Sequence, residues 1–242
     1  MALIPGATTG ADFLLGTGGD ETYRALDGDD VLVDFGGGDR FDGGPGNDTI
    51  LLDAIGRVTG QFLTDRIIDV IVDLELRTQS DGGIAGDADI VISIENYTHY
   101  GNFNYSIAGT DGSNVFKTDR GKDMLFGRGG ADKLMSGGNA DTVDGGSGRD
   151  VIAAGRGNDL STGGTGADRF VFKQGDGRDT ITDFTDLNVA TDDHIVISRA
   201  LFQNLQITSD SQGTLLDFGT AGSIFLADVA ADTIGRSDFV LT

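Results

Sequence analysis

The 242-residue sequence contains no cysteine and no tryptophan. Disulfide bonds are therefore excluded, and a core built on large aromatic side chains is not expected. Basic residues are also few, since 17 Lys and Arg stand against 39 Asp and Glu and leave a formal net charge of -22. This balance argues against nucleic acid and anionic lipid as partners and makes cations the natural counterpart.

Long apolar stretches are missing as well. No run approaches the roughly 18 apolar residues of a membrane-spanning helix, so we predict no transmembrane segment. The first ten residues, MALIPGATTG, lack the basic stretch and the long apolar core of a conventional cleaved export signal. Such a signal is therefore not predicted at this end.

Glycine is abundant, with 40 residues, and it recurs with aspartate in a nine-residue pattern. The stretch GGSGRDVIAAGRGNDLSTGGTGADRFVF, residues 145–172, contains an aspartate every nine residues. Frames counted from Gly145 run unbroken from residue 100 to residue 171. Position six of these frames is occupied by Tyr105, Asn114, Asp123, Asp132, Asp141, Asp150, Asp159 and Asp168. Position eight is apolar in every frame except that of Ser161, so the acidic and hydrophobic periods coincide.

A second register of five frames covers residues 7–51. Position four is always glycine, position six is an acid and position eight is hydrophobic. The acids are Asp12, Glu21, Asp30, Asp39 and Asp48. Five consecutive frames with all three features in phase are very improbable in a merely Asp- and Gly-rich linker, so both blocks are interpreted as structural repeats.

The chemistry of the nine positions predicts the fold. Glycine permits positive φ and close backbone approach, so the first six residues predict a tight turn whose carbonyl groups can point inward. The last three residues, apolar in the middle, predict a short strand, and two facing frames close an 18-residue coil. Stacked coils place parallel strands about 4.8 Å apart with the position-eight side chains between them. The predicted fold is all-β, a parallel β-roll (β-solenoid).

Stacking brings acids of successive coils within about one strand spacing of each other. Two carboxylates at that distance repel by about 1 kcal/mol in bulk water and by several in a partly buried setting. A hard divalent cation between the turns reverses this balance, and calcium suits six or more oxygen ligands drawn from aspartates and turn carbonyls. Because the hydrophobic core is thin, we expect the chain to fold on calcium and to be largely disordered without it.

Seven pairs of position-six acids are 18 residues apart, which predicts about seven calcium ions. The pairs are Asp12 with Asp30, Glu21 with Asp39, Asp30 with Asp48, Asp123 with Asp141, Asp132 with Asp150, Asp141 with Asp159 and Asp150 with Asp168. Position-four glycines complete the candidate metal sites: Gly19, Gly28, Gly37, Gly46, Gly121, Gly130, Gly148, Gly157 and Gly166. Asn114 and Tyr105 predict weaker sites at the start of the second block, because an amide is a poorer ligand than a carboxylate and a phenol is normally none.

Three nonapeptides carry a family resemblance. GGPGNDTIL (43–51), GGSGRDVIA (145–153) and GGTGADRFV (163–171) resemble the glycine-rich repeat of the RTX, or hemolysin-type calcium-binding, family. The resemblance implies a calcium-binding parallel β-roll and export through a type I secretion channel in an unfolded, calcium-free state. The chain departs from the repeat at Glu21 and at Asn139, which stands at a glycine position. Its last residues, SDFVLT, are similar to the uncleaved C-terminal export signal of such proteins.

Outside the repeats the pattern also predicts β-structure. We expect a first repeat block at 1–51, a β segment at 52–99 that continues the stack without metal, a second block at 100–180, and a C-terminal region at 181–242. RIIDVIVDLEL and DADIVISIENY predict strands, joined by the turn-rich RTQSDGGIAGDA. HIVIS, TLLDFG and SIFLADV predict an antiparallel, β-rich C-terminal cap, and SRALFQNL predicts one short helix.

Catalytic patterns are missing from the sequence. The two histidines, His99 and His194, lie far apart and outside any H-E-x-x-H pattern. There is no cysteine nucleophile, no G-x-S-x-G and no Walker loop. Metal binding already explains the acids, so a glycosidase pair has no independent support. We predict that the protein is not an enzyme.

The leading hypothesis is a secreted calcium-binding protein, extracellular or attached to the cell surface, with a structural or matrix role of the S-layer or biofilm kind. Its expected partners are calcium, the type I secretion machinery, and either copies of itself or cell-surface polysaccharide. Because the first frame starts at Ala7, we expect the roll to be the protein rather than the tail of an enzyme. Two alternatives stay open: a secreted effector or accessory protein at a host membrane, disfavoured by the charge, and an enzyme with a site that these motifs do not capture.

Overall fold

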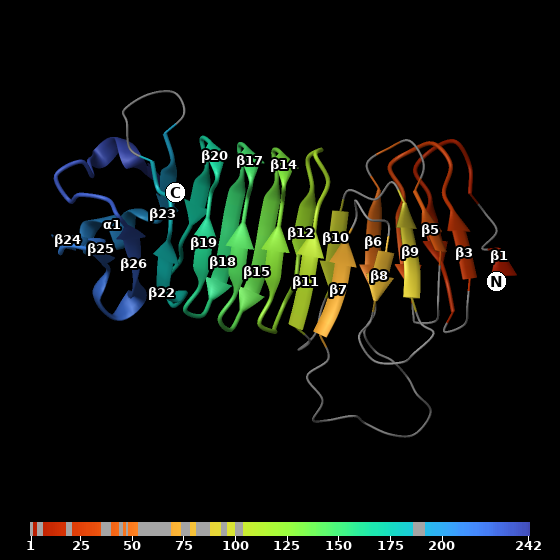
Figure 1. Cartoon of the computed structure of the whole chain (residues 1–242), viewed down its shortest axis with the longest axis horizontal. Coiled ribbons are helices and arrows are strands. Elements are labelled where there is room, and N and C mark those ends of the chain that lie inside the picture. The colour runs from red at the N-terminus through yellow and green to blue at the C-terminus, as the bar shows by residue number, and fades with distance from the viewer. Residues whose placement is uncertain are drawn as a thin grey trace, which may run out of the picture.

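The computed structural model of the chain describes residues 2–3, 7–17, 21–34, 40–43, 46, 48–52, 69–73, 78–80, 88–92, 96–99, 104–185 and 192–242. Over these residues the protein is a parallel β-solenoid, and its strands stand side by side along the long axis (Figure 1). The predicted fold class is confirmed.

Two long sheets form the walls of the roll. In the described part of the chain, the first wall contains, in spatial order, β1 (Ala2–Leu3), β3 (Glu21–Arg24), β5 (Arg40–Asp42), β9 (Ala88–Ile92), β8 (Thr78–Ser80), β7 (Asp69–Asp73), β11 (Asn104–Ala108), β13 (Met124–Phe126), β16 (Thr142–Asp144), β19 (Leu160–Thr162), β22 (Gly177–Ile181), β26 (Gly222–Ala227), β25 (Gly213–Asp217) and β24 (Gln206–Ser209). The second wall contains β2 (Phe13–Leu15), β4 (Val31–Asp34), β6 (Thr49–Leu52), β10 (Asn96–His99), β12 (Val115–Lys117), β15 (Lys133–Gly138), β18 (Val151–Arg156), β21 (Arg169–Val171), β23 (His194–Ile197) and β27 (Phe239–Leu241). A small third sheet at the turns consists of β14 (Gly129–Gly130), β17 (Ser147–Gly148) and β20 (Thr165–Gly166).

The pairing register confirms the 18-residue coil. β15 pairs in parallel with β18, with Leu134 opposite Ile152. β13 pairs in parallel with β16, with Leu125 opposite Val143. The same step relates β2 to β4 and β4 to β6 in the first block. Each coil therefore contributes one strand to each wall, as two nonapeptides facing each other require.

The position-eight side chains fill the space between the walls. Those that the structure describes as buried hydrophobics are Leu14, Tyr23, Leu32, Ile107, Phe116, Leu125, Leu134, Val143, Ile152 and Phe170. Ser161, the polar exception, is buried too, and its carbonyl accepts the N–H of Thr182 at 3.0 Å. Tyr105 stands at position six of its frame, but its side chain lies in the core. One large side chain per nonapeptide gives a core that is continuous but narrow.

The segment between the two repeat blocks joins the stack through an antiparallel insert. β9 pairs in parallel with β5, β7 pairs in parallel with β11, and β8 lies antiparallel between β7 and β9. β10 connects β6 to β12 in the second wall. The strands predicted in RIIDVIVDLEL and DADIVISIENY are confirmed. RTQSDGGIAGDA, the predicted turn-rich connection, also contains a strand, because Thr78–Ser80 form β8 between two strands that each need a partner.

The C-terminal region combines roll strands with an antiparallel cap. β23 continues the second wall in parallel with β21, and β27 continues it in parallel with β23. β26 pairs in parallel with β22, and in the described region it is β24, β25 and β26 that form an antiparallel meander. The prediction of an antiparallel cap is therefore wrong for HIVIS, because Ile195 continues the column of buried side chains and places its strand in the roll.

A short helical segment packs against the last strands. The helix predicted in SRALFQNL is α1 (Arg199–Gln203), and the 3-10 helices η1 (Gly219–Ala221) and η2 (Arg236–Asp238) follow it. The Ser198 side chain caps α1 by accepting the N–H of Leu201 at 3.3 Å. The ring of Phe202 packs edge-on against Phe239 with 5.2 Å between centroids, which attaches α1 to the second wall.

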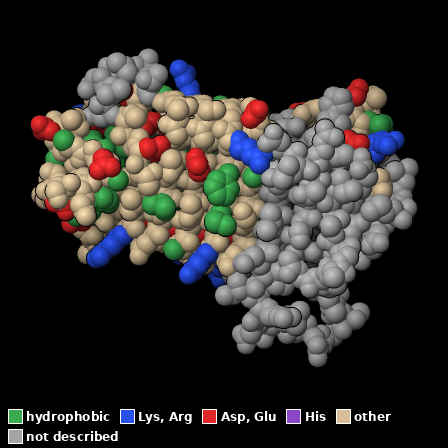
Figure 2. All heavy atoms as spheres, viewed as in Figure 1, with side chains coloured by type: hydrophobic (Ala, Val, Ile, Leu, Met, Phe, Trp, Pro, Cys, Tyr) green, Lys and Arg blue, Asp and Glu red, His purple; other side chains and the backbone are tan. Residues whose placement is uncertain are grey.

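The surface of the roll is mixed in character. On the face shown in Figure 2, acidic, basic and hydrophobic side chains are interspersed over the described part. Phe13, Leu15, Met124 and Leu160 are among the large apolar side chains exposed to solvent. No helix in the described residues is long and apolar enough to cross a membrane.

Two neighbouring residues on β13 test the narrow core. Leu125 is 0% exposed, whereas Met124 is 45% exposed. We expect Leu125→Ala to lower the free energy of unfolding of the calcium-loaded protein by about 2–5 kcal/mol, because it leaves a cavity between stacked coils. Met124→Ala, the matched control, should cost less than about 1 kcal/mol. Urea unfolding in saturating calcium measures both, and equal losses would contradict a core formed by position eight.

Candidate metal centre

The position-six aspartates form two columns inside the turns, one for each set of alternate frames. In each column the Oδ1 atom of one aspartate accepts the backbone N–H of the position-six residue one coil earlier. Asp132 N–H donates to Asp150 Oδ1 at 2.8 Å, and Asp150 N–H donates to Asp168 Oδ1 at 2.8 Å. The same bond joins Asp12 to Asp30, Asp30 to Asp48, Tyr105 to Asp123, Asn114 to Asp132, Asp123 to Asp141, and Asp141 to Asp159. The 18-residue acid pairs predicted from these residues are thus brought together.

The second oxygen of these carboxylates is the unusual feature. In the described structure, Oδ2 is buried without a hydrogen-bond partner in Asp30, Asp123, Asp132, Asp141, Asp150, Asp159 and Asp168. A buried, unpaired oxygen on an ionised group is costly, and native structures normally pair such atoms with a donor or a cation. The columns therefore present a row of oxygens that lack a positive partner.

Position-one glycines shape the space next to these oxygens. A Cβ at Gly145 would lie 2.5 Å from Asp150 Oδ2 and 2.7 Å from the Gly163 carbonyl oxygen. A Cβ at Gly163 would lie 2.5 Å from Asp168 Oδ2, and a Cβ at Gly127 would likewise collide with Asp132 Oδ2. Glycine at position one thus keeps open a cradle between a carboxylate oxygen and a backbone carbonyl. The sequence alone does not reveal this role, because the repeat contains several glycines and their spacing does not distinguish those at position one.

The predicted position-four glycines lie in the same turns but serve the backbone. Gly28, Gly130, Gly148 and Gly166 have φ of 130°, 106°, 141° and 142°. A Cβ at Gly148 would collide with the Gly130 carbonyl oxygen, and a Cβ at Gly166 with that of Gly148. These positions need glycine because the coils approach closely there. Gly121 also has a positive φ of 155°, while a Cβ at Gly157 would lie 2.6 Å from Asp159 Oδ1 and one at Gly46 would lie 3.3 Å from Asp48 Oδ1.

Part of the first predicted block falls outside the described residues. Gly19, Gly37 and Asp39 are not described, and for Glu21 the structure describes only the backbone of β3. The structure therefore does not test the predicted pairing of Glu21 with Asp39, which stays a prediction. Of the acids in this block, Asp12, Asp30 and Asp48 are placed in one column.

Two further aspartates extend the columns beyond the predicted set. Asp159 N–H donates to Asp179 Oδ1 at 3.2 Å, and Asp168 N–H donates to Asp193 Oδ1 at 2.9 Å. These steps are 20 and 25 residues long, so the nine-residue frame does not reach them. A signal was nevertheless present, because an isoleucine that the structure buries follows each acid by two residues, as position eight follows position six.

The start of the second block differs as predicted from the residue types. Tyr105 contributes its N–H to Asp123, but its ring lies in the core and offers no oxygen to the column. Asn114 Oδ1 accepts the N–H of Thr110 at 2.9 Å. The amide oxygen thus takes part in closing its own turn, where the equivalent aspartates contribute a charged group to the column.

Burial raises the pKa of the column carboxyls. Loss of hydration is the largest cause, and it raises the pKa of Asp132 to about 7, of Asp141 to about 8 and of Asp179 to about 7. The backbone N–H bond to each carboxylate opposes this rise, and the neighbouring carboxylates add to it. Without a cation, protonation near neutral pH is thus favoured at Asp141 and partial at Asp132 and Asp179, whereas Asp159 and Asp168, whose pKa rises only to about 6, stay mostly ionised.

The donor set fits a hard cation. It consists of carboxylate and carbonyl oxygens, which suit calcium better than softer metals. In the described residues no three acidic or histidine side chains converge on one point, so an ion in a column would depend on turn carbonyls as well as on aspartates. This is the combination that the coil geometry supplies.

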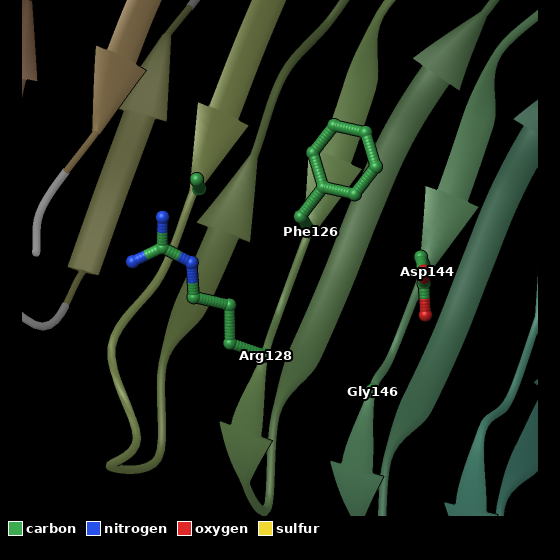
Figure 3. Close-up of a pocket in the computed structure, with 5 residues that line it drawn as sticks. Phe126, Arg128, Asp144 and Gly146 are labelled. Carbon is green, nitrogen blue, oxygen red and sulfur yellow. The ribbon is translucent and has the colours of Figure 1, made fainter.

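A shallow hollow of about 280 Å³ on the first wall lies outside the columns. It is lined by Ala108, Phe126, Arg128, Asp144 and Gly146 (Figure 3). The Arg128 side chain extends away from Asp144, and its Nη1 donates to the Gly109 carbonyl at 3.0 Å. The charged groups of the hollow therefore do not converge on a common point.

Comparison with known proteins identifies the repeat. A family model described as the RTX calcium-binding nonapeptide repeat matches four times, at residues 7–32, 15–50, 108–143 and 135–170. Among solved structures, the chain is similar to the extracellular lipase LipA from Serratia marcescens, with 22% identity, a TM-score of 0.31, and coverage of 98% of this chain and 39% of the lipase chain. It is also similar to the AlgE6R3 subunit of the Azotobacter vinelandii mannuronan C5-epimerase, with 24% identity, a TM-score of 0.35, and coverage of 58% of this chain and 80% of that subunit. No curated protein matches the sequence.

The glycine cradle predicts the effect of a single methyl group. We expect Gly145→Ala to raise the calcium concentration at the midpoint of folding by about fivefold or more, or roughly 1 kcal/mol, because the new Cβ fills the space beside Asp150 Oδ2. Gly112→Ala is the matched control, since the nearest contact of its Cβ would be Thr110 Oγ1 at 3.5 Å. Calcium titrations followed by circular dichroism compare the two variants, and equal midpoints would argue against the cradle.

The raised pKa values predict how pH acts on the metal-free chain. An aspartate whose pKa is higher in the folded than in the unfolded state favours folding while it is protonated. This contribution is complete below about pH 4 and is lost as pH rises through the folded values of about 7 for Asp132 and about 8 for Asp141. We therefore expect β-structure in the metal-free protein to increase from pH 8 towards pH 4. With calcium present, the folding midpoint should instead shift to lower calcium as pH rises, because protons and metal compete. Circular dichroism at each pH tests both trends, and a metal-free spectrum that does not change with pH would contradict the first.

Proposed function

Because the chain carries RTX calcium-binding nonapeptide repeats, we propose that it is a secreted protein that folds on calcium outside the cell and serves as a structural component of the cell surface or extracellular matrix. The observation that supports this most directly is the row of buried carboxylate oxygens without a partner. A fold that buries so many carboxylates inside its turns is stabilised by an external cation. Without a cation, the same ionised groups would destabilise the fold.

In this proposal the calcium ions lie between successive coils of one column. The groups that would hold an ion are the Oδ2 atoms of paired aspartates, such as Asp132 and Asp150, together with turn carbonyls such as that of Gly145. When bound, calcium supplies the positive charge that an ionised column lacks. The Oδ1 atom of each aspartate accepts a backbone N–H of the preceding coil and so links successive coils. About seven ions follow from the predicted pairs. Asp179 and Asp193 lengthen the two columns through Oδ1, while Oδ2 of Asp193 already accepts the N–H of Thr185 at 2.8 Å.

Calcium then controls where the chain is folded. In a compartment poor in free calcium, the columns repel and the chain stays extended enough for a type I secretion channel, while outside the cell the ions assemble the coils. The proposed export signal, Asp238–Leu241, belongs to η2 and β27 in the folded protein. Asp238 and Phe239 are buried there, so recognition of these residues by the secretion machinery belongs to the unfolded chain.

A structural role suits the folded form better than catalysis does. Strands of the repeats lie in both walls of the roll. The acids that could resemble a catalytic pair are already explained as metal ligands. We propose that blocks 1–51 and 100–180 are the calcium-folded parts, that 52–99 joins them, and that 181–242 closes the roll and carries the export signal. The flat outer walls of such a roll offer regular surfaces for contact with copies of the same chain.

Calcium-dependent folding and assembly test this proposal. Circular dichroism of the full chain should be largely disordered in chelator and β-rich in millimolar calcium, and Asp150→Asn should raise the calcium midpoint because one carboxylate of a column loses its charge. Light scattering in calcium should then show concentration-dependent growth of large species. A spectrum already β-rich in chelator at neutral pH would contradict folding on calcium. A strictly monomeric, calcium-loaded protein that permeabilises vesicles would contradict the structural role and indicate an effector.

A further inference from the structure

The strong negative charge of the chain is distributed very unevenly. Residues 104–185 contain ten Lys and Arg against twelve Asp, whereas residues 7–52 contain two Arg against ten acids. Of the twelve aspartates, seven belong to the columns inside the turns: Asp123, Asp132, Asp141, Asp150, Asp159, Asp168 and Asp179. The outer surface of the second block therefore carries about twice as many basic as acidic side chains, on a protein whose net charge is -22.

Part of this basic charge lies on the second wall. On β12, β15, β18 and β21 the middle residue of each nonapeptide strand is buried, so positions seven and nine point outward. The outward side chains of these strands, called here the basic face, are Val115, Lys117, Lys133, Met135, Val151, Ala153, Arg169 and Val171. None of these described outward residues is acidic, and the next strand, β23, adds His194 and Val196 at the same positions.

The strand register fixes where the charges of the basic face lie. Lys133 and Arg169 are both exposed and both pair with Val151, which lies on the strand between them. Two strand spacings separate their backbones by about 10 Å. Lys117 lies on β12, one strand away from Lys133 on the other side. A linear partner laid across the strands thus meets cations that are one and then two strand spacings apart, with Val151 on the strand between Lys133 and Arg169.

We propose that the basic face binds an acidic polysaccharide, a linear polymer of carboxylated or sulphated sugars, and that it does so when calcium has assembled the coils. The proposal rests on the proposed function, because the face exists only in the folded roll. Calcium contributes in two ways: it brings the strands that carry Lys117, Lys133 and Arg169 into one wall, and it neutralises the column acids beneath them. Binding should therefore require calcium even though calcium does not touch the polymer at this face.

Charge and shape favour this partner over other polyanions. No described aromatic side chain points outward from β12, β15, β18 or β21, so the stacking that supports binding of single-stranded nucleic acid is missing from this face. Apart from Val115, which is 37% exposed, the apolar residues of the basic face are half-buried, and none is an exposed aromatic or leucine side chain of the kind that inserts into a membrane. The rest of the chain has a net charge of about -20, which repels a densely charged duplex more strongly than a polymer with one charge per sugar or per disaccharide.

The experiment uses the full chain and hyaluronan, which carries one carboxylate per disaccharide, with dextran sulphate as the sulphated counterpart and neutral dextran as the negative probe. Binding is measured by titration calorimetry in millimolar calcium and in chelator at low ionic strength. Lys133→Glu combined with Arg169→Glu reverses two charges of the basic face. Arg24→Glu combined with Arg199→Glu is the matched control, since it makes the same change in net charge at exposed arginines away from this face. Calcium-induced circular dichroism is recorded for every variant.

The expected result is binding of hyaluronan, dextran sulphate or both in calcium and none in chelator, with about tenfold weaker binding for the basic-face variant and less than about twofold change for the control. A basic-face variant that folds on calcium and binds like the wild type overturns the proposal. So does a calcium-folded wild type that binds neither acidic polymer, or that binds single-stranded DNA or anionic vesicles more tightly. Failure of the wild type to fold on calcium would instead reject the proposed function, so the two failures are distinguishable.

Discussion

The roll depends on how a single aspartate uses its two carboxylate oxygens. Oδ1 accepts a backbone N–H from the preceding coil, and this bond repeats at about 2.8 Å along both columns. In seven of the described column aspartates, from Asp30 to Asp168, Oδ2 is left buried with no donor. The first oxygen makes stacking specific, because only the correct register brings the N–H to the carboxylate. The second makes stacking conditional, because an ionised oxygen in that place is unfavourable until a cation compensates it. Specificity and dependence on the environment thus come from the same side chain.

Much of this arrangement is readable from the sequence, since the acid and the core residue follow the same nine-residue period. That period predicts the coil length, the two walls, the buried column at position eight and the pairing of acids such as Asp132 with Asp150, all of which the structure contains. The prediction fails where the period stops. Asp179 and Asp193 reach the columns after 20 and 25 residues, two and seven more than a coil of 18, while β22 and β23 keep their places in the walls.

Other features depend on neighbours that lie far away in the chain. β8 has little strand character of its own, and it forms because β7 and β9 both have an open edge beside it. HIVIS has the alternation of any half-buried strand, and only its partner β21 decides that it runs parallel. The sequence also does not show that glycines at different positions of the repeat have different structural roles. Position one faces the carboxylate oxygen and position four faces the carbonyl of the preceding coil, although both read simply as glycine.

The inner and outer positions of the repeat are under separate constraints. Positions one, four, six and eight are committed to the turn, the column and the core, whereas positions seven and nine face solvent and are free to differ between coils. The two blocks use this freedom differently, since the first keeps an acidic exterior while the second carries most of the basic residues of the chain. The total charge of -22 therefore does not describe the surface of the second block that a partner would meet, because about -20 of it comes from the rest of the chain.

Successive nonapeptides contribute strands to the two walls in turn. An insertion or deletion therefore keeps later strands in the same wall only if its length is a multiple of 18 residues. Adding or removing 18 residues inserts or deletes one complete coil and leaves every later strand in its wall, as the register of β15 and β18 illustrates. A change of nine residues preserves each turn and each buried side chain, but it transfers all later strands to the opposite wall. Lys117 and Arg169 would then stand on different sides of the roll if the change fell between them. Gene duplication within such a repeat is thus free to lengthen the solenoid, but it conserves a patterned surface only when it copies whole coils.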